Sequence, residues 1–319
     1  MPSFAVTIQD YSPLVSYDEN WRAGNSRDSY LDRRVLSRQS AKLSLTVANR
    51  YSDNSMMVTN VTGASATFWF NGTGVSIYGA KRSNHGSYQV TLDGTSFPAE
   101  SGYDSTGIFQ TLLFSSITLD QGSHELILTN QGVEEYLDID FITWQTSIGG
   151  LNESLTVNTV QDTDPSFTYT PSLAWSSNPE HSDFYFGSTG HSSVKYGSFM
   201  TYNFSGEGVS LYGPVGPNYA AFSAQLDDGP LVTSTAIRAN FVPQVLLYHA
   251  DGLGSGQHAL KVTMQPSDDA QELAVDFANV YTTSSAQSSW VGCKLLCIRL
   301  LNFDLGFQQH HTGEQIMLC

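Results

Sequence analysis

The sequence predicts an all-β protein made of two tandem antiparallel β-sandwich (jelly-roll) domains. Nearly the same ten letters occur twice, as "FNGTGVSIYG" at 70–79 and as "FSGEGVSLYG" at 204–213. Short β-rich stretches that end in Gly, Asn or Asp recur along the chain, whereas helical periodicity extends over no useful length. Many short strands separated by Gly-rich turns are typical of sandwiches, in which two sheets enclose the core.

The doubled decapeptide belongs to a longer self-match. At an offset of 134 residues, His124 corresponds to His258. Upstream, "TIQDYSPLVSY" at 7–17 matches "TVQDTDPSFTY" at 159–169. Because the matches follow one another in order, we predict that a single module was copied.

Each copy contains four clear strand candidates, in which side chains alternate or run short and β-rich. The candidates are 75–79, 87–94, 124–130 and 136–144 in the first copy, and 209–213, 222–229, 258–264 and 273–281 in the second. Local turn chemistry accompanies them. The two glycines of "F-x-G-x-G-V" are expected to take positive φ in a tight reversal. In "LDG" the Asp is expected to bond the backbone two residues on.

These motifs resemble the tandem β-sandwich ectodomains of fungal cell-surface proteins. The resemblance rests on "FNGTGVSIYG", "YQVTLDG", "LDQGSHELILTN" and "LDIDFITW" with their second-copy partners, and covers roughly residues 1–146 and 155–283. It implies galactose-binding-like jelly rolls, the architecture of many carbohydrate-binding modules. It also implies an extracellular or cell-surface protein that binds a glycan.

The resulting division has four parts. Repeat 1 covers 1–146 and includes a basic insertion at about 34–50, a linker covers 147–154, repeat 2 covers 155–283, and a disordered or aberrant tail covers 284–319. The insertion differs in composition from its surroundings, and so does the tail. Two interpretations of the insertion stay open, a surface loop with an added strand or translated intron, and the intron interpretation extends to the tail.

Composition and charge limit the classes of molecule that this chain can bind. The chain has 30 acidic and 14 basic side chains, which gives a formal net charge of −16. Such a chain repels phosphate backbones, so we expect no nucleic-acid partner. All three cysteines (Cys293, Cys297 and Cys319) lie in the tail, so the body is expected to fold without disulfides.

Membrane attachment and glycosylation are the next questions. The sequence shows no signal peptide and no run of about 18 apolar residues, so attachment is expected only if the natural C-terminus differs from this one. Candidate glycosylation sites are Asn60, Asn71, Asn152 and Asn203.

Few residues suggest catalysis or metal binding. We interpret His124 and His258 as packed histidines bonded to a neighbouring carbonyl, because catalytic residues seldom need duplicating. Asp140 and Asp276 are expected to bond loop amides or, alternatively, to bind calcium, which needs six or more oxygen ligands. No nucleophile elbow, metalloprotease motif or phosphate loop is present, so no cofactor other than calcium is expected.

Aromatic side chains are the better indication of a ligand. Flat sugar faces stack on such rings while polar loop groups fix the hydroxyl directions. The candidate residues are Trp21, Trp175, Tyr78, Tyr212 and Trp69. For Trp21 and Trp175 the alternative is a role in capping the core. Trp69 corresponds to Asn203 in the second copy, so we expect it to be a surface ring of the first copy alone.

Three functions follow from these observations. The leading hypothesis is non-catalytic binding of a glycan or cell-wall polysaccharide, strengthened by two linked copies. The second is a structural or adhesive ectodomain whose partners are other surface proteins. The third is a polysaccharide-active hydrolase or its accessory module, which would need two carboxyl groups converging in a cleft of one copy.

Overall fold

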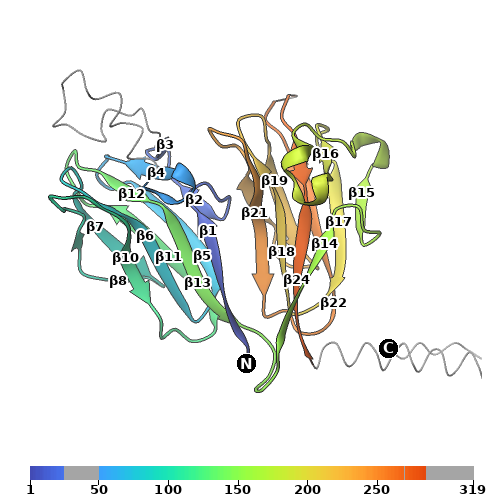
Figure 1. Cartoon of the computed structure of the whole chain (residues 1–319), viewed down its shortest axis with the longest axis horizontal. Helices are drawn as coiled ribbons and strands as arrows, with labels where there is room; N and C mark the ends of the chain where they lie inside the picture. Colours follow the sequence, from blue (N-terminus) through green and yellow to red (C-terminus); the bar gives the residue numbers. More distant parts are fainter. Residues whose placement is uncertain (25–49, 269, 285–319) are drawn as a thin grey trace, which may run out of the picture.

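The computed structural model describes residues 1–24, 50–268 and 270–284 (Figure 1). The chain is all-β, as predicted, and the strands within these described ranges form six antiparallel sheets. Residues 34–49 of the insertion predicted at about 34–50, and residues 285–319 of the tail predicted at 284–319, lie outside the described residues. The 3-10 helices in the described part of the chain are η2 (Ser52–Asn54), η3 (Ser172–Ala174), η4 (Ser182–Phe184) and η5 (Phe186–Ser188). Within the described ranges, no helix is long and apolar enough to cross a membrane.

Three sheets make up the first sandwich, which comprises the strands from β1 to β13. The first sheet has the order β1 (Ser3–Gln9), β13 (Phe141–Ser147), β6 (Gly74–Lys81) and β10 (Ile108–Ser116). The second has the order β2 (Val15–Tyr17), β5 (Ser65–Gly72), β11 (Gly122–Asn130), β7 (Ser87–Leu92) and β8 (Thr95–Ser96), and β9 (Glu100–Ser101) also pairs with β7. The third has the order β12 (Leu137–Ile139), β4 (Met56–Thr59) and β3 (Arg22–Gly24).

The second sandwich comprises the strands from β14 to β24 and also contains three sheets in the described residues. Its first sheet has the order β14 (Leu155–Gln161), β24 (Phe277–Thr283), β18 (Gly208–Val215) and β21 (Val242–Asp251). Its second has the order β15 (Phe167–Thr170), β17 (Phe199–Ser205), β22 (Gln257–Gln265), β19 (Ala221–Leu226) and β20 (Val232–Thr235). Its third pairs β16 (His191–Ser193) with β23 (Leu273–Val275). The larger sheets thus have corresponding strand orders in both sandwiches. A tandem duplication and the division at 146 and 155 remain our proposals.

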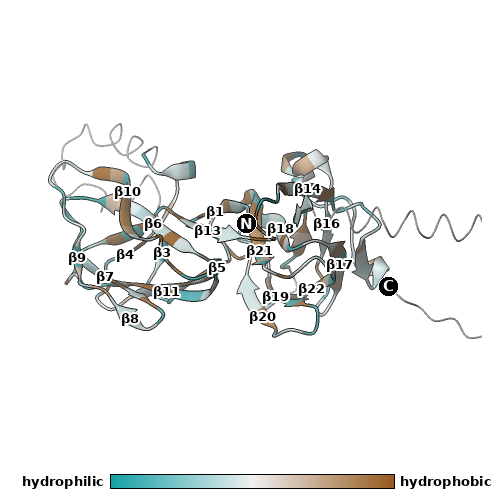
Figure 2. Ribbon diagram, turned by 90° about the horizontal axis from the view of Figure 1, so that it is seen from below, coloured by the Kyte–Doolittle hydropathy of each residue, from teal (hydrophilic) through white to brown (hydrophobic). Residues whose placement is uncertain are grey.

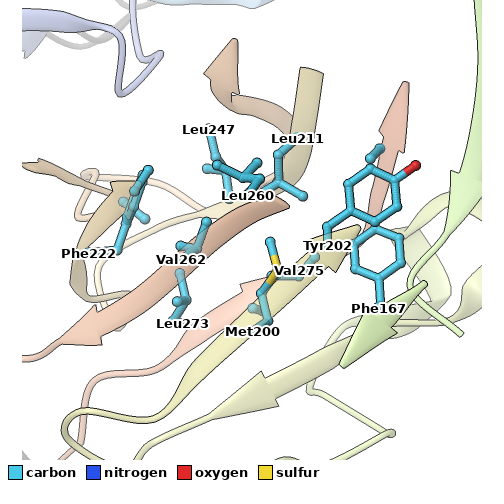
Figure 3. Close-up of a cluster of buried hydrophobic side chains, with 14 of the residues drawn as sticks. Phe167, Met200, Tyr202, Leu211, Phe222, Leu247, Leu260, Val262, Leu273 and Val275 are labelled. Atoms are coloured by element: carbon cyan, nitrogen blue, oxygen red, sulfur yellow. The ribbon is translucent and has the colours of Figure 1, made fainter. Parts of the chain in front are cut away.

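Strand alternation explains how each core forms. Along β5, Phe68 and Phe70 are buried while Trp69 between them is exposed, because successive side chains point to opposite faces of a sheet. The second sandwich follows the same rule: Met200 and Tyr202 of β17 point into the core shown in Figure 3. Each such fully buried side chain contributes roughly 1.5–3 kcal/mol through removal of apolar surface from water.

The glycines of "F-x-G-x-G-V" have a different role from the predicted one. Neither Gly72 nor Gly74 has positive φ. Instead, a Cβ at Gly72 would overlap the carbonyl oxygen of Gln145, and one at Gly74 would lie 2.9 Å from that of Ser116. These glycines are therefore needed for close approach of neighbouring strands rather than for a left-handed turn.

The prediction for Asp in "LDG" was also wrong. Asp93 itself has φ 51°, followed by Gly94 at 75°. Its Oδ1 accepts the backbone N–H of Glu125 at 2.9 Å, and its Oδ2 lies 2.7 Å from Nδ1 of His124. The side chain thus bonds the neighbouring strand β11, because its left-handed backbone turns it toward that strand.

The two sandwiches stand side by side, with β1 and β2 of the first facing the side of the second that carries β19 and β21 (Figure 1). Arg238 joins them: its Nε donates to the carbonyl oxygen of Tyr11 at 2.6 Å and its Nη2 to that of Ser12 at 3.0 Å. Leu246 of β21 is buried within the hydrophobic cluster of the first sandwich. The interface therefore combines apolar packing with satisfied polar groups.

Candidate functional site

A cleft with a volume of about 900 Å³ lies between the sandwiches. Its first wall consists of β2, the residues that follow it to 23, and Trp69 of β5. Its second wall consists of parts of β19, β20 and β21 and of residues 237–239. Figure 2 shows the neighbouring strands β5 and β20, which carry residues of the two walls. A volume of this size suits a ligand of one to a few sugar rings.

Trp69 is the exposed ring of this cleft. Its side chain has 54% of its surface exposed, and it stands on the outer face of β5 opposite Glu125 of β11. Its inward neighbours Phe68 and Phe70 stack at 5.6 Å and anchor the strand. Because Trp69 is held on a rigid strand, its ring is preorganised for stacking. The corresponding Asn203 is exposed on β17 and does not line the cleft.

Two further rings of the first sandwich form the floor of the cleft. Trp21 is buried at 6% exposure and packs beside Tyr17, with the ring centroids 5.3 Å apart. The Tyr17 hydroxyl donates to the carbonyl oxygen of Asp10 at 2.9 Å. Trp21 Nε1 is buried without a hydrogen-bond partner. Trp21 is thus mainly a core residue whose edge reaches the cleft.

The other aromatic candidates lie elsewhere. Trp175 is buried in the core of the second sandwich, and its Nε1 donates to the carbonyl oxygen of Thr170 at 3.5 Å. Tyr78 stacks on Phe141 at 4.4 Å, and Tyr212 stacks on Phe277 at 4.4 Å. Of the five ring residues that the sequence singles out, the structure brings only Trp69 and Trp21 to the cleft.

A row of hydrogen-bonded polar side chains, which the sequence did not predict, lies beside the cleft. Ser210 Oγ lies 2.7 Å from His249 Nδ1, and His249 Nε2 lies 3.0 Å from Asp251 Oδ2. The order resembles a nucleophile–base–acid triad, but Ser210 is fully buried and contacts Tyr281 as well. Across the interface, Asn71 Nδ2 donates to Asp251 Oδ1 at 2.6 Å. We interpret this chain as a polar connection between the sandwiches.

Acidic residues in the cleft do not form a catalytic pair. Asp18 is the one carboxylate among the described lining residues. Its oxygens accept the N–H groups of Ser65 at 2.6 Å and Asn20 at 2.8 Å. Partial burial disfavours the charged form, but these backbone hydrogen bonds outweigh it and hold the pKa of Asp18 below its usual value. Asp18 is therefore an ionised structural acceptor.

Asp140 and Asp276 are fully buried between the last two strands of each sandwich. Each bonds a loop amide: Asp140 Oδ1 accepts the N–H of Ser52 at 2.9 Å, and Asp276 Oδ1 accepts that of Phe186 at 3.0 Å. Burial raises the pKa of both carboxyls to about 7. Among the described residues, no group of three or more His, Cys, Asp or Glu side chains is placed to hold a metal ion. Calcium at these positions stays a prediction.

The paired histidines pack as expected. His124 Nε2 lies 2.9 Å from the carbonyl oxygen of Asp120, and its ring packs on Phe70. His258 repeats this arrangement with the carbonyl oxygen of Gly254 at 3.4 Å and the ring of Phe204. Both rings support a turn, which matches the structural interpretation.

Three candidate glycosylation sites, Asn60, Asn152 and Asn203, are exposed. Asn71 differs, because its amide nitrogen is engaged with Asp251 at the interface. Arg50 at the end of the predicted insertion donates to the carbonyl oxygen of Gly107 at 3.0 Å and lies 3.8 Å from the ring of Phe109.

Comparisons with known proteins give one sequence relative. No protein-family model matches this chain. Over 216 residues the chain is 26% identical to the A type blood alpha-D-galactosamine galactosaminidase of Flavonifractor plautii. The match covers 66% of this chain and 19% of that enzyme, so the chain spans about a fifth of the relative's length. The comparisons give no support to a fungal origin.

Solved structures show low similarity. The Paenibacillus xanthan lyase is 16% identical, with 86% of this chain and 26% of that chain covered and a TM-score of 0.29. The extracellular domain of ANXUR1 from Arabidopsis thaliana is 10% identical, with 89% and 97% covered and a TM-score of 0.27. A family two carbohydrate esterase from Cellvibrio japonicus is 10% identical, with 40% and 34% covered and a TM-score of 0.28.

Proposed function

We propose that this chain binds a glycan without catalysing a reaction, in the cleft between its two sandwiches. The observation that carries the proposal is Trp69, a ring 54% exposed at the wall of a 900 Å³ cleft. A sugar face stacks on this ring, and polar groups of the opposite wall, such as the exposed Thr233, accept or donate hydrogen bonds to its hydroxyls. The relative named for galactosamine supports a carbohydrate ligand, and the chain corresponds to only part of that enzyme.

Binding fits the cleft better than hydrolysis does. Glycoside hydrolysis requires two carboxyl groups on either side of the scissile bond. The cleft offers Asp18 alone, and its oxygens are already occupied by backbone amides. The proposed role is thus that of a binding unit, alone or beside a catalytic domain. We extend the proposal to an extracellular setting, which the exposed sequons at Asn60, Asn152 and Asn203 support.

The test is a comparison of corresponding positions in the two sandwiches. We expect Trp69→Ala to weaken glycan binding at least about tenfold, because loss of an aromatic anchor costs about 2 kcal/mol or more. Asn203→Ala, at the corresponding place outside the cleft, should leave affinity unchanged. A glycan array identifies the ligand, and titration calorimetry measures both variants. Equal affinity of Trp69→Ala and wild type would contradict the proposal.

A second candidate function is binding of a protein partner at β10, the edge strand of its sheet. Ile108 and Leu112 on this strand are both about half exposed, and Ile117 beyond its end is 76% exposed. In Figure 2 part of the β10 ribbon is brown, the colour of hydrophobic residues. Unpaired edges with apolar side chains favour association with another chain. Leu112→Lys would abolish such association while leaving glycan binding intact, which separates the two functions.

A further inference from the structure

A second cavity lies at the end of the interface that holds the linker, with a volume of about 540 Å³. Its walls come from both sandwiches: Gln121 and Ser147 from the first, the turn at 148–150, and Glu207 with the loop at 252–255 from the second. No function described above uses this cavity. Its lining includes two acidic side chains, Glu153 and Glu207.

Glu207 is the unusual group. Its side chain has only 8% of its surface exposed, and its Oε2 is buried with no hydrogen-bond partner. Its backbone is fixed on both sides, because its N–H donates to the carbonyl oxygen of Tyr281 and its own carbonyl accepts from Leu253. A buried carboxylate oxygen without a partner is unusual, because burial removes its hydrating water and no hydrogen bond within the protein offsets the free-energy cost. The corresponding residue of the first sandwich, Thr73, carries no charge.

The remaining lining makes the cavity negative. Glu153 is the second ionisable side chain, and its Oε2 accepts the N–H of Gly150. Among the described lining residues there is no Lys, Arg or His side chain, and the amino terminus at Met1 is the remaining positive group. Ser147 and Ser255 add hydroxyl groups, whereas Gln121 Oε1 already accepts the N–H of Ser147 at 3.1 Å. Two carboxylates beside hydroxyl groups favour a cation that can donate hydrogen bonds.

We propose that this cavity binds the protonated amino group of an amino sugar, with Glu207 as its main counter-ion. The volume favours a group of the size of a sugar ring over a bare metal ion, which would leave most of the space unfilled. The net charge of −16 also attracts a polycationic glycan and speeds its association. This inference deepens the proposed function and rests on it for the glycan class.

Asn71 lies between a residue that lines the cleft and a residue that lines the second cavity. Gln121 of the second cavity donates from Nε2 to Asn71 Oδ1 at 3.2 Å. Asn71 stands two residues from Trp69 on the same face of β5. Asn71, which also donates to Asp251 across the interface, thus lies between Trp69 of the cleft and Gln121 of the second cavity.

The experiment compares a glucosamine oligomer with its fully N-acetylated counterpart of equal length, at mildly acidic pH, by titration calorimetry on the full chain. We expect wild type to prefer the free amine by about tenfold or more, since a hydrogen bond to a charged group is worth roughly that factor. Glu207→Gln keeps the shape and removes the charge, so it should bind both oligomers equally. Glu100→Gln, on the distant strand β9, should retain the wild-type preference.

Further variants separate the two proposals. Trp69→Ala should weaken both oligomers by a similar factor while the preference for the amine survives. If no oligomer binds but glucosamine still raises the melting temperature of wild type and not of Glu207→Gln, the cavity is supported and the cleft is not. Should Glu207→Gln fail to fold, Glu153→Gln takes its place, with a smaller expected loss of preference because Glu153 is the lesser counter-ion.

Three results would overturn the amine site. One is equal affinity of wild type for both oligomers. Another is stabilisation by calcium chloride, dependent on Glu207, in the absence of any effect of glucosamine, which would make the cavity a metal site. The third is release of new reducing ends from the oligomer, which would assign the two glutamates to hydrolysis.

Discussion

In the first sandwich, two hydrogen bonds hold the buried residue Asp10 in place. Asp10, which follows β1, is 2% exposed. Its Oδ1 accepts the hydroxyl of Ser55 at 2.6 Å, and its carbonyl oxygen accepts that of Tyr17 at 2.9 Å. Burial, opposed by Ser55, raises the pKa of Asp10 to about 8.

The second sandwich repeats this arrangement and adds a histidine. Asp162 accepts the hydroxyl of Thr189 at 2.6 Å, and its carbonyl oxygen accepts that of Tyr169 at 2.8 Å. Its Oδ2 lies 2.5 Å from Nδ1 of His191. At the corresponding position the first sandwich has Met57, which offers no comparable partner.

This difference shows which properties the two halves share. The tyrosine hydroxyl that donates to the backbone of this aspartate is the same in both, whereas the histidine beside the carboxylate is His191 in the second and is replaced by Met57 in the first. Trp69 against Asn203, and Glu207 against Thr73, follow the same rule. The positions that differ are therefore the better candidates for function, and the shared ones for stability.

The largest expected effect concerns β10 and β21. Leu246 is 5% exposed within the cluster of the first sandwich, whereas the corresponding Leu112 is 46% exposed. Leu246→Ala should lower the free energy of unfolding by about 2–4 kcal/mol, and Leu112→Ala by less than about 1 kcal/mol. Urea unfolding followed by tryptophan fluorescence measures both. Equal losses would show that the two edges are not distinguished by the interface.

The next effect is the pH dependence of stability. The ordinary pKa of an aspartate side chain is 3.8, and burial raises the folded values of Asp10, Asp140 and Asp276 to about 8, 7 and 7. The folded chain therefore keeps protons that the unfolded chain releases. For these groups, stability should be greatest below about pH 4 and should fall as pH rises toward 8.

Melting temperatures between mildly acidic and mildly basic pH check this slope. Asp10→Asn removes one of the three carboxyls, so the slope of this variant should be shallower than that of wild type. A melting temperature that rises steadily with pH would contradict the raised pKa values.

The smallest effect concerns the sequons. In a secretory host we expect glycans at Asn60, Asn152 and Asn203, which are exposed, but little at Asn71, whose amide nitrogen binds Asp251. Glycopeptide mass spectrometry gives the occupancy of each site. High occupancy at Asn71 would mean that the interface forms only after glycosylation, or not at all.

Local patterns predicted much of the fold. The expected strand at 75–79 lies within β6 (Gly74–Lys81), and the strand at 124–130 within β11. The expected strand at 136–144 is wrong as a single element, because β12 ends at Ile139 and β13 begins at Phe141 in another sheet. Residue periodicity continues across Asp140, so the change of sheet leaves no signal in the pattern.

The site was less predictable, for a physical reason. Trp69 stood out because its counterpart in the second copy is polar, and it does line the cleft. The opposite wall, with Tyr248 and Arg238, depends on how two separately patterned halves dock. Docking arises from surface shape and charge rather than from periodicity. The hydrogen-bonded residues Ser210, His249 and Asp251 could not be predicted as a group, because they belong to two strands that become neighbours only in the folded sheet.

The clasp made by Arg238 grips main-chain oxygens of residues 11 and 12 rather than their side chains. Every amino acid supplies the same carbonyl, so a substitution at 11 or 12 leaves the acceptors of Arg238 in place. The side chains at these positions make other contacts: the Tyr11 hydroxyl donates to Asp53 at 2.7 Å, and Ser12 Oγ donates to the carbonyl oxygen of Leu246 at 3.3 Å. Relatives that keep this pairing of halves should therefore retain a guanidinium at 238, whichever residues supply the two carbonyls.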